Sequence, residues 1–224
     1  MISMNAIYGM IFSLIISLVL PLGLIVWVRR KYKASLFSFF VGMVAWFVAV
    51  QVLEAPIHYY LLVGNESTAQ FLSQPIAYML YGGLMAGLFE ETARLICFKF
   101  ILKKQNRIQD SIAYGIGHGG IEAMLLVSLT YLSNLVFSFL INNGTLSSLG
   151  MPAELTDVLQ SQLMTTDASL FWVAGIERIG AIVVHIGLSV LVFKAVKSRR
   201  YGYYLLAILL HAALNFPAAL AQLG

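Results

Sequence analysis

Residues 7–33 read IYGMIFSLIISLVLPLGLIVWVRRKYK. The stretch 7–28 carries no charge, and a helix needs about 20 mostly apolar residues to span a bilayer, so it predicts a transmembrane helix that ends at a basic cluster. No basic region precedes this stretch and no small-residue cleavage site follows it. We therefore expect it to remain as an anchor and not to be removed as a signal peptide.

The rest of the chain has the same character. Of its 224 residues, 60% are hydrophobic and 11% are charged, and the mean hydropathy is +0.85, whereas soluble domains are about 45 to 50% apolar and about 25% charged. We predict one integral-membrane domain over residues 1–224, an all-α polytopic bundle of about six helices. The expected spans are 7–28, 35–62, 75–102, 111–142, 170–194 and 201–223. A break near Asn134 in the long fourth span would create a seventh, re-entrant piece.

Basic residues are concentrated after the first, third and fifth spans. The three clusters are Arg29, Arg30, Lys31 and Lys33; Lys99, Lys103, Lys104 and Arg107; and Lys194, Lys197, Arg199 and Arg200. Because basic loops stay in the cytoplasm, we predict a multi-pass cell-membrane protein with cytoplasmic basic turns and both termini outside. This bias accounts for the net charge of +4. The expected surroundings are lipid, and no nucleic-acid partner is indicated.

Several ionisable or polar side chains interrupt the apolar spans at a similar depth. They are Glu90, Glu91, Arg94, His118, Glu122, His185, His211 and Asn215. At 1.5 Å per residue they lie about 10 to 21 Å from the basic ends of four different helices. Charged groups inside a membrane are costly and usually functional, so we expect these side chains to converge.

Helical spacing indicates which of these groups share a face. Residues four apart are aligned, which gives the pairs Glu90 with Arg94, His118 with Glu122, and His211 with Asn215. Arg178 aligns with His185, whereas Glu177 lies about 80° away on the same helix; both are expected to support the site. Glycines at 83, 87, 115, 117, 119 and 120 would let the helices approach closely.

The charges do not balance within the spans. Arg94 and Arg178 are the available cations for four carboxylates, Glu90, Glu91, Glu122 and Glu177. At least one carboxyl group is then protonated, shared with a histidine, or next to water or metal. That state suits a general base.

A second pair with helical spacing, Glu54 and His58, lies in the second span with Pro56 between the two residues. His58 is about five residues from the outer end of that span. The sequence therefore places this pair near the external headgroups, outside the expected site.

The polar set suits hydrolysis. A glutamate can activate water, a histidine can align it or protonate a leaving amine, and His or Asn donors can stabilise an oxyanion. Alternatively, zinc could be held by candidates His118, His185, His211 and Glu91. The sequence contains no HExxH and no GxSxG motif, which are the usual signatures of zincins and serine hydrolases.

Four segments carry a resemblance to a known family: FEETAR (89–94), GIGHGGIEA (115–123), ERIGAIVVH (177–185) and HAALN (211–215). In this order they resemble the YhfC family of intramembrane proteases, which is similar to PrsW and to the CAAX-protease and bacteriocin-processing group. In the CAAX-type pattern the arginine stands one residue further from the double Glu than it does here. The choice between Glu90 and Glu91 as the base stays open.

The resemblance implies a bacterial, multi-helix peptidase that cleaves a peptide or membrane-protein substrate in or beside the bilayer. By position, Glu90 or Glu91 would activate water with His118, Arg94 would orient the carboxylates, and His211 and Asn215 would support the oxyanion. His185 would be a further catalytic or ligand residue. Both metallo and glutamic mechanisms are associated with the family.

Two other functions fit the same residues. Ionisable groups near the membrane midplane also occur in proton-coupled transporters, although no inverted repeat is visible. A non-catalytic protein resembling the multi-pass scaffold subunit of gamma-secretase would keep the histidines, but here the double Glu is intact.

Overall fold

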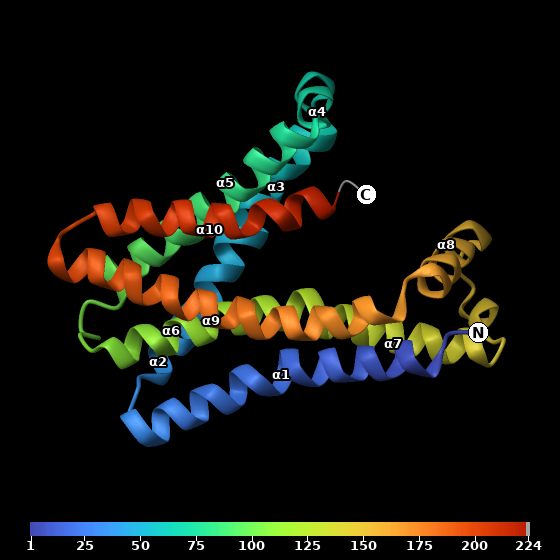
Figure 1. Ribbon diagram of the computed structural model, residues 1–224, viewed down its shortest axis with the longest axis horizontal. Helices are drawn as coiled ribbons and strands as arrows, with labels where there is room; N and C mark the ends of the chain where they lie inside the picture. The colour runs from blue at the N-terminus through green and yellow to red at the C-terminus, as the bar shows by residue number, and fades with distance from the viewer. Residues whose placement is uncertain (223–224) are drawn as a thin grey trace.

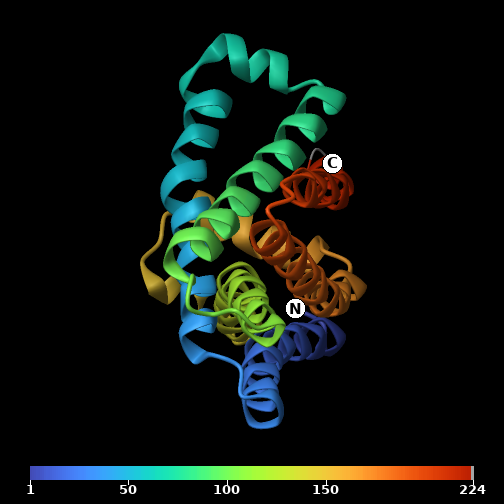
Figure 2. The same cartoon turned by 90° about the vertical axis from the view of Figure 1, so that its left-hand side faces the viewer.

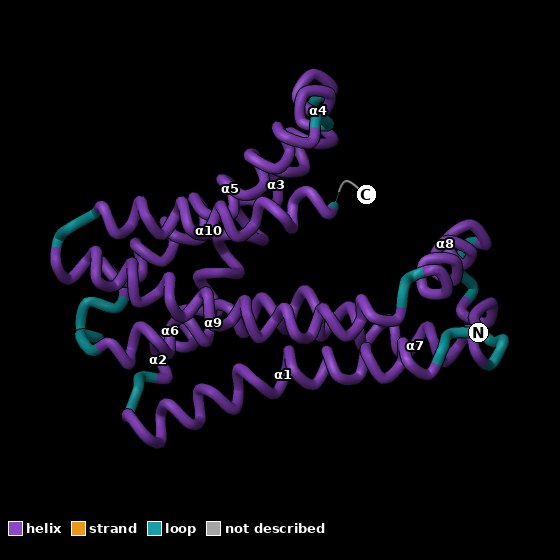
Figure 3. Tube along the Cα trace, viewed as in Figure 1, coloured by secondary structure: helices purple, strands orange, loops and turns teal. Residues whose placement is uncertain are grey.

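A computed structural model describes residues 1–222 as an assembly of helices, with no strand in that range (Figure 3). The α-helices are α1 (Met4–Tyr32), α2 (Leu36–Trp46), α3 (Ala55–Tyr59), α4 (Glu66–Leu72), α5 (Pro75–Ile96), α6 (Ile108–Ala123), α7 (Leu129–Asn142), α8 (Ala153–Thr165), α9 (Ala168–Ser198) and α10 (Gly202–Ala221). π-Helical stretches at Phe47–Glu54, Tyr60–Gly64, Cys97–Ile101 and Met124–Ser128 extend or join them, and a short 3-10 helix covers Leu146–Leu149. The all-α prediction is confirmed.

Five helical segments are long and apolar enough to cross a membrane. They are Met4–Tyr32, Leu36–Gly64, Ile108–Asn142, Ala168–Ser198 and Gly202–Ala221. They correspond to five of the six expected spans, although residue 223 of the last expectation lies outside the described residues. The remaining expected span is also helical, as α5, and its 22 residues reach about 33 Å. Its charged residues lower its hydropathy below that of the other five.

The fourth span is one rod and does not break at Asn134. Residues Ile108–Asn142 continue from α6 into α7 through the π-helical stretch Met124–Ser128. One asparagine disfavours a helix by only about 0.7 kcal/mol relative to alanine, whereas a break in lipid would leave several backbone groups unpaired. The re-entrant seventh piece was therefore a wrong prediction.

The three basic turns gather at one end of the molecule, opposite the N-terminus (Figure 1). Arg107 Nη2 donates to the carbonyl of Lys33 at 2.6 Å, and Lys197 Nζ bonds Asn106 Oδ1. These contacts tie the turn before α2, the loop before α6 and the end of α9 together. The positive charge thus forms one face.

Close helix crossings place the centre of the bundle. α5 crosses α10, and α6 packs along α9 (Figures 1 and 2). A Cβ atom added at Gly87 would lie 2.7 Å from the carbonyl oxygen of Ile208 on α10, and one at Gly115 would lie 2.6 Å from Ile186 Cα on α9. Only glycine allows these approaches, which bring the polar segments of four helices together.

Candidate functional site

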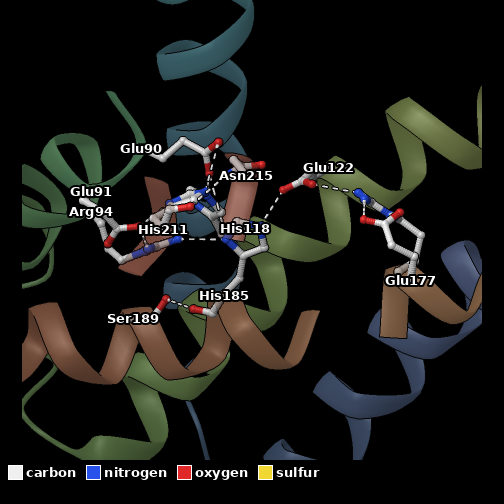
Figure 4. A network of polar contacts seen from close by, with 11 residues as sticks. Glu90, Glu91, Arg94, His118, Glu122, Glu177, His185, Ser189, His211 and Asn215 are labelled. Carbon is white, nitrogen blue, oxygen red and sulfur yellow. Dashed lines mark hydrogen bonds and ion pairs between the residues drawn. The ribbon is translucent and has the colours of Figure 1, made fainter. Parts of the chain in front are cut away.

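Six ionisable side chains from four helices converge in the middle of the bundle (Figure 4). α5 supplies Glu90, Glu91 and Arg94, α6 supplies His118, α9 supplies His185, and α10 supplies His211. All six are buried, and none is more than 6% exposed. Residues far apart in the sequence therefore form one cluster.

Glu91 and Arg94 form an ion pair inside this cluster. Arg94 Nη1 donates to Glu91 Oε1, which also lies 2.7 Å from His211 Nδ1. Arg94 Nη2 is 3.2 Å from His185 Nδ1. The four-residue spacing had aligned Arg94 with Glu90, but the ion pair joins Arg94 to Glu91, three residues away, because α5 turns this edge toward α9 and α10.

Glu90 faces imidazoles. Its Oε2 lies 2.7 Å from His118 Nε2 and 3.9 Å from His185 Nδ1, and its Oε1 lies 3.9 Å from His211 Nε2. No lysine or arginine among the described residues forms an ion pair with it. Glu90 and Glu91 are neighbours in sequence but have different surroundings.

A second acidic branch extends from His185 to the margin of the site. Glu122 Oε2 lies 2.6 Å from His185 Nε2, without the alignment of a hydrogen bond, and Glu122 Oε1 accepts from Arg178 Nη1 at 2.7 Å. Arg178 also bonds Glu177, whose side chain is 55% exposed. Arg178 and His185, which the helical period had placed on one face, therefore both contact Glu122.

This arrangement distributes the two arginines over the four carboxylates. Arg94 balances Glu91, and Arg178 bonds both Glu122 and Glu177. Glu90 is the carboxylate left without a guanidinium. The charge count of the sequence could not say which carboxylate this would be.

Glu90 and Glu122 line a cavity of about 410 Å³. Asn215 also lines it, and its Nδ2 donates to the carbonyl of His211 at 3.2 Å. A larger groove of about 860 Å³ lies between α2 and α5, but neither a carboxylate nor an imidazole lines it. The smaller cavity therefore reaches the cluster at Glu90, with Glu122 and Asn215 beside it.

Glu54 and His58 line the same cavity as Glu90. Sequence spacing had separated this pair from the site. Counting residues from the end of a span gives the depth of Glu54 and His58 along their helix. Whether their side chains face the cavity depends instead on how that helix is oriented in the bundle. Tyr81 on α5, which no sequence motif marks, joins the pair, because its hydroxyl is 2.6 Å from His58 Nδ1.

Comparison with known proteins agrees with this ordered set of motifs. The family model described as "YhfC intramembrane metalloprotease" matches residues 16–224. The chain belongs to the YhfC family. It is 44% identical over 227 residues to the "Uncharacterized membrane protein YhfC" of Bacillus subtilis (strain 168), covering all of this chain and 88% of that protein. No solved structure matches the chain.

The YhfC family description implies a metal, and the clustered side chains can be tested against it. Glu90, His118 and His185 offer buried ligand atoms within 4.8 Å of one another. Two imidazoles and one carboxylate form a donor set of catalytic zinc sites, in which a fourth position holds water. His118 Nδ1 is buried and lacks a hydrogen-bond partner within residues 1–222. This donor set fits a zinc-like ion.

The set differs from the ligands suggested by the sequence. Glu90 takes the place of Glu91, whose carboxylate is bound to Arg94 and His211, and His211 is not part of the group. His185 contacts a charged partner at each ring nitrogen, Arg94 at Nδ1 and Glu122 at Nε2. A metal at His185 would therefore compete with one of these two partners.

Proposed function

We propose that the protein is an intramembrane endopeptidase in which Glu90 is the proton-transferring carboxylate. The observation that carries the proposal is the position of Glu90, which lines the cavity, contacts His118 at 2.7 Å and has no guanidinium partner among the described residues. A carboxylate free of a fixed counter-ion can accept and release a proton during the reaction. Membership of the YhfC family supports the same reaction class.

The proposed reaction is addition of water to a peptide carbonyl. Glu90 takes the proton of the attacking water and later passes it to the leaving amine, so that one C–N bond breaks and one C–O bond forms. His118 holds the Glu90 carboxylate in position through its Nε2 contact. Asn215 lines the cavity, where its amide can donate to the developing oxyanion.

The remaining charges position these groups. Arg94 joins Glu91 to His185, and Glu91 in turn bonds His211 Nδ1. His211 Nε2 is thereby directed toward Glu90, 3.9 Å away. Glu122, with Arg178 and Glu177 behind it, restrains the other side of His185.

If a metal were bound, Glu90 would act as a ligand and no longer as the proton-transferring carboxylate. Glu90, His118 and His185 would hold the metal, and a zinc ion bound there would activate water and polarise the peptide carbonyl. In that case the partner of His185 that the metal leaves in place, Arg94 or Glu122, would orient this imidazole, as groups outside the ligand set commonly do.

A cleavage assay tests the proposal. Purified protein in proteoliposomes is incubated with a library of membrane-tethered peptides, and products are identified by mass spectrometry. We expect wild type to cleave and Glu90→Gln to lose at least about 100-fold in rate, the contribution of one general base. Glu66→Gln, a carboxylate substitution in α4 outside the cluster, should cleave as wild type does.

Two results would contradict the proposal. One is cleavage that survives both Glu90→Gln and His118→Asn in correctly folded protein. The other is an absence of cleavage together with peptide-driven proton uptake into the liposomes. That result would favour a proton-coupled transporter.

A further inference from the structure

A second polar cluster, outside the network of Arg94 and Arg178, connects the second span to α5. His58 Nε2 lies 2.9 Å from Glu54 Oε1, and His58 Nδ1 lies 2.6 Å from the hydroxyl of Tyr81. Glu54 is only 3% exposed, whereas 31% of the His58 side chain is exposed. We call Glu54, His58 and Tyr81 the cavity trio.

The trio shares the 410 Å³ cavity with Glu90. It does not balance the charge of the central cluster, because no ion pair links Glu54 or His58 to Glu90, Glu91 or Glu122 in residues 1–222. Burying an ionisable pair in a membrane protein is costly. Apolar side chains would be cheaper if this wall only had to pack.

Trp46 lines the same cavity and, within residues 1–222, has an unpaired polar group of its own. It lines the cavity and is 1% exposed, and its indole N–H has no hydrogen-bond partner among the described residues. A buried donor without an acceptor is unfavourable and uncommon in native proteins. A bound molecule that offers a carbonyl oxygen would satisfy it.

The hydrogen bonds of the trio can reverse direction. If His58 Nε2 donates to Glu54, Nδ1 accepts from Tyr81, and the phenol oxygen keeps lone pairs for an incoming N–H. If His58 is protonated it donates to both partners, and the Tyr81 O–H is then free to donate to a carbonyl. The second oxygen of Glu54 makes no hydrogen bond within residues 1–222. The cavity trio can therefore accept a hydrogen bond from an N–H group of a bound molecule or donate one to its carbonyl oxygen.

Peptide hydrolysis inside a membrane requires groups of this kind. A transmembrane helix hides its peptide bonds, so a segment must unwind before water can attack, and its freed N–H and C=O groups find no partner in lipid. The cost of unwinding falls if the protein replaces the lost hydrogen bonds.

We propose that the cavity trio, with the indole of Trp46, binds the backbone of an unwound peptide segment and positions it beside Glu90. This inference rests on the proposed function, and it names the substrate class as a locally unwound transmembrane segment. The three trio members are positioning residues. Recognition of the backbone makes them selective for helix-breaking sequences and not for one side chain.

Binding to matched peptides tests the inference separately from catalysis. The probes are a fluorescent polyleucine peptide with a central Gly-Pro pair and the same peptide with Leu-Leu in its place. Affinities are measured by anisotropy in lipid nanodiscs, with Glu90→Gln protein so that neither probe is cleaved. We expect the Gly-Pro probe to bind about tenfold more tightly, the effect of about one or two net hydrogen bonds.

Each variant is made in the Glu90→Gln background. The substitutions are Tyr81→Phe, His58→Phe and Trp46→Phe, and at Glu54 two separate variants, Glu54→Leu and Glu54→Gln. Tyr81→Phe and His58→Phe should each remove most of the preference for the Gly-Pro probe and leave the affinity for the Leu-Leu probe unchanged. Glu54→Gln keeps an acceptor oxygen and should retain more of the preference than Glu54→Leu. Tyr131→Phe, on α7 and away from the cavity, is the matched tyrosine control.

Either of two outcomes would overturn the inference. Folded trio variants could keep the full preference, or they could weaken both probes equally, as expected if the trio only joins the second span to α5. Failure of the proposed function gives a different pattern: wild type does not cleave the Gly-Pro probe, while the preference and its dependence on Tyr81 remain.

Discussion

Glu90 Oε2 lies 2.7 Å from His118 Nε2, while the adjacent Glu91 is bound by Arg94 and by His211 Nδ1. Successive residues of a helix point about 100° apart, so two neighbouring carboxylates on α5 enter different environments. Glu91 is a fixed counter-ion inside the bundle. Glu90 lines the cavity and has no guanidinium partner among the described residues.

The Glu91 and Arg94 pair should be important for stability. Both side chains are fully buried, and removing one partner of a buried pair leaves an uncompensated charge, at a cost of about 3 to 5 kcal/mol. We expect Glu91→Gln and Arg94→Gln each to lower the free energy of unfolding in detergent by that amount. The double variant should lose less than the sum, since it leaves no lone charge. Strict additivity in the unfolding measurements would refute this coupling.

A zinc ion, if bound, should depend on Glu90 and His118. Purified wild type is expected to contain zinc by elemental analysis, to lose it to a chelator and to unfold at a lower temperature afterwards. Zinc at 100 times its dissociation constant should then restore about 2.7 kcal/mol of stability. Glu90→Gln and His118→Ala should show little restoration, and Glu66→Gln should behave as wild type. Equal zinc content and equal restoration in all four proteins would place the metal elsewhere.

Close approach of α5 and α10 should be needed for the site. A Cβ at Gly87 would lie 2.7 Å from the carbonyl oxygen of Ile208, whereas a Cβ at Gly180 would meet nothing within 4 Å. We expect Gly87→Ala to cost about 1 to 3 kcal/mol, as overpacking does, and to slow peptide cleavage because Glu91 moves away from His211. Gly180→Ala should change the free energy of unfolding by no more than about 1 kcal/mol. The rate of peptide cleavage should change by no more than the factor that corresponds to this free energy. The comparison fails if the two alanines have the same effect.

The orientation of the chain can be tested with single cysteines. Cys97 is the single cysteine and is buried, so Cys97→Ser gives a background without reactive thiols. In intact cells, an impermeant maleimide should label Glu154→Cys on α8 and should not label Lys104→Cys in the basic loop, because basic loops stay inside. Permeabilised cells provide the control in which both cysteines react. The reversed pattern in intact cells would invert the topology.

The helices could be predicted because lipid imposes a simple requirement on the backbone. Every peptide group in the bilayer core must be hydrogen-bonded, so an apolar run of about 20 residues is read as a helix with few alternatives. The same requirement explains why Asn134 does not interrupt the fourth span. α5 was also predicted, although it carries three charged residues and is not among the five segments that are long and apolar enough to cross a membrane.

The depth of the site was also accessible, since a fixed rise per residue converts sequence position into height along a rod. The contact partners of each side chain could not be predicted from the sequence. Spacing aligned Arg94 with Glu90, yet the ion pair is with Glu91, and spacing set His58 apart from a cavity that it lines. Height along a helix says nothing about which neighbour the side chain faces.

The sequence alone determined that this protein is a helical membrane protein with acids and imidazoles from four spans at one level, because hydropathy and helical rise are local properties. The tertiary structure decided which carboxylate lines the cavity without a guanidinium partner among the described residues. That choice depends on how α5 is rotated against α9 and α10, and it rests on contacts such as Arg94 with His185 and Glu91 with His211, which join residues 91 and 120 positions apart.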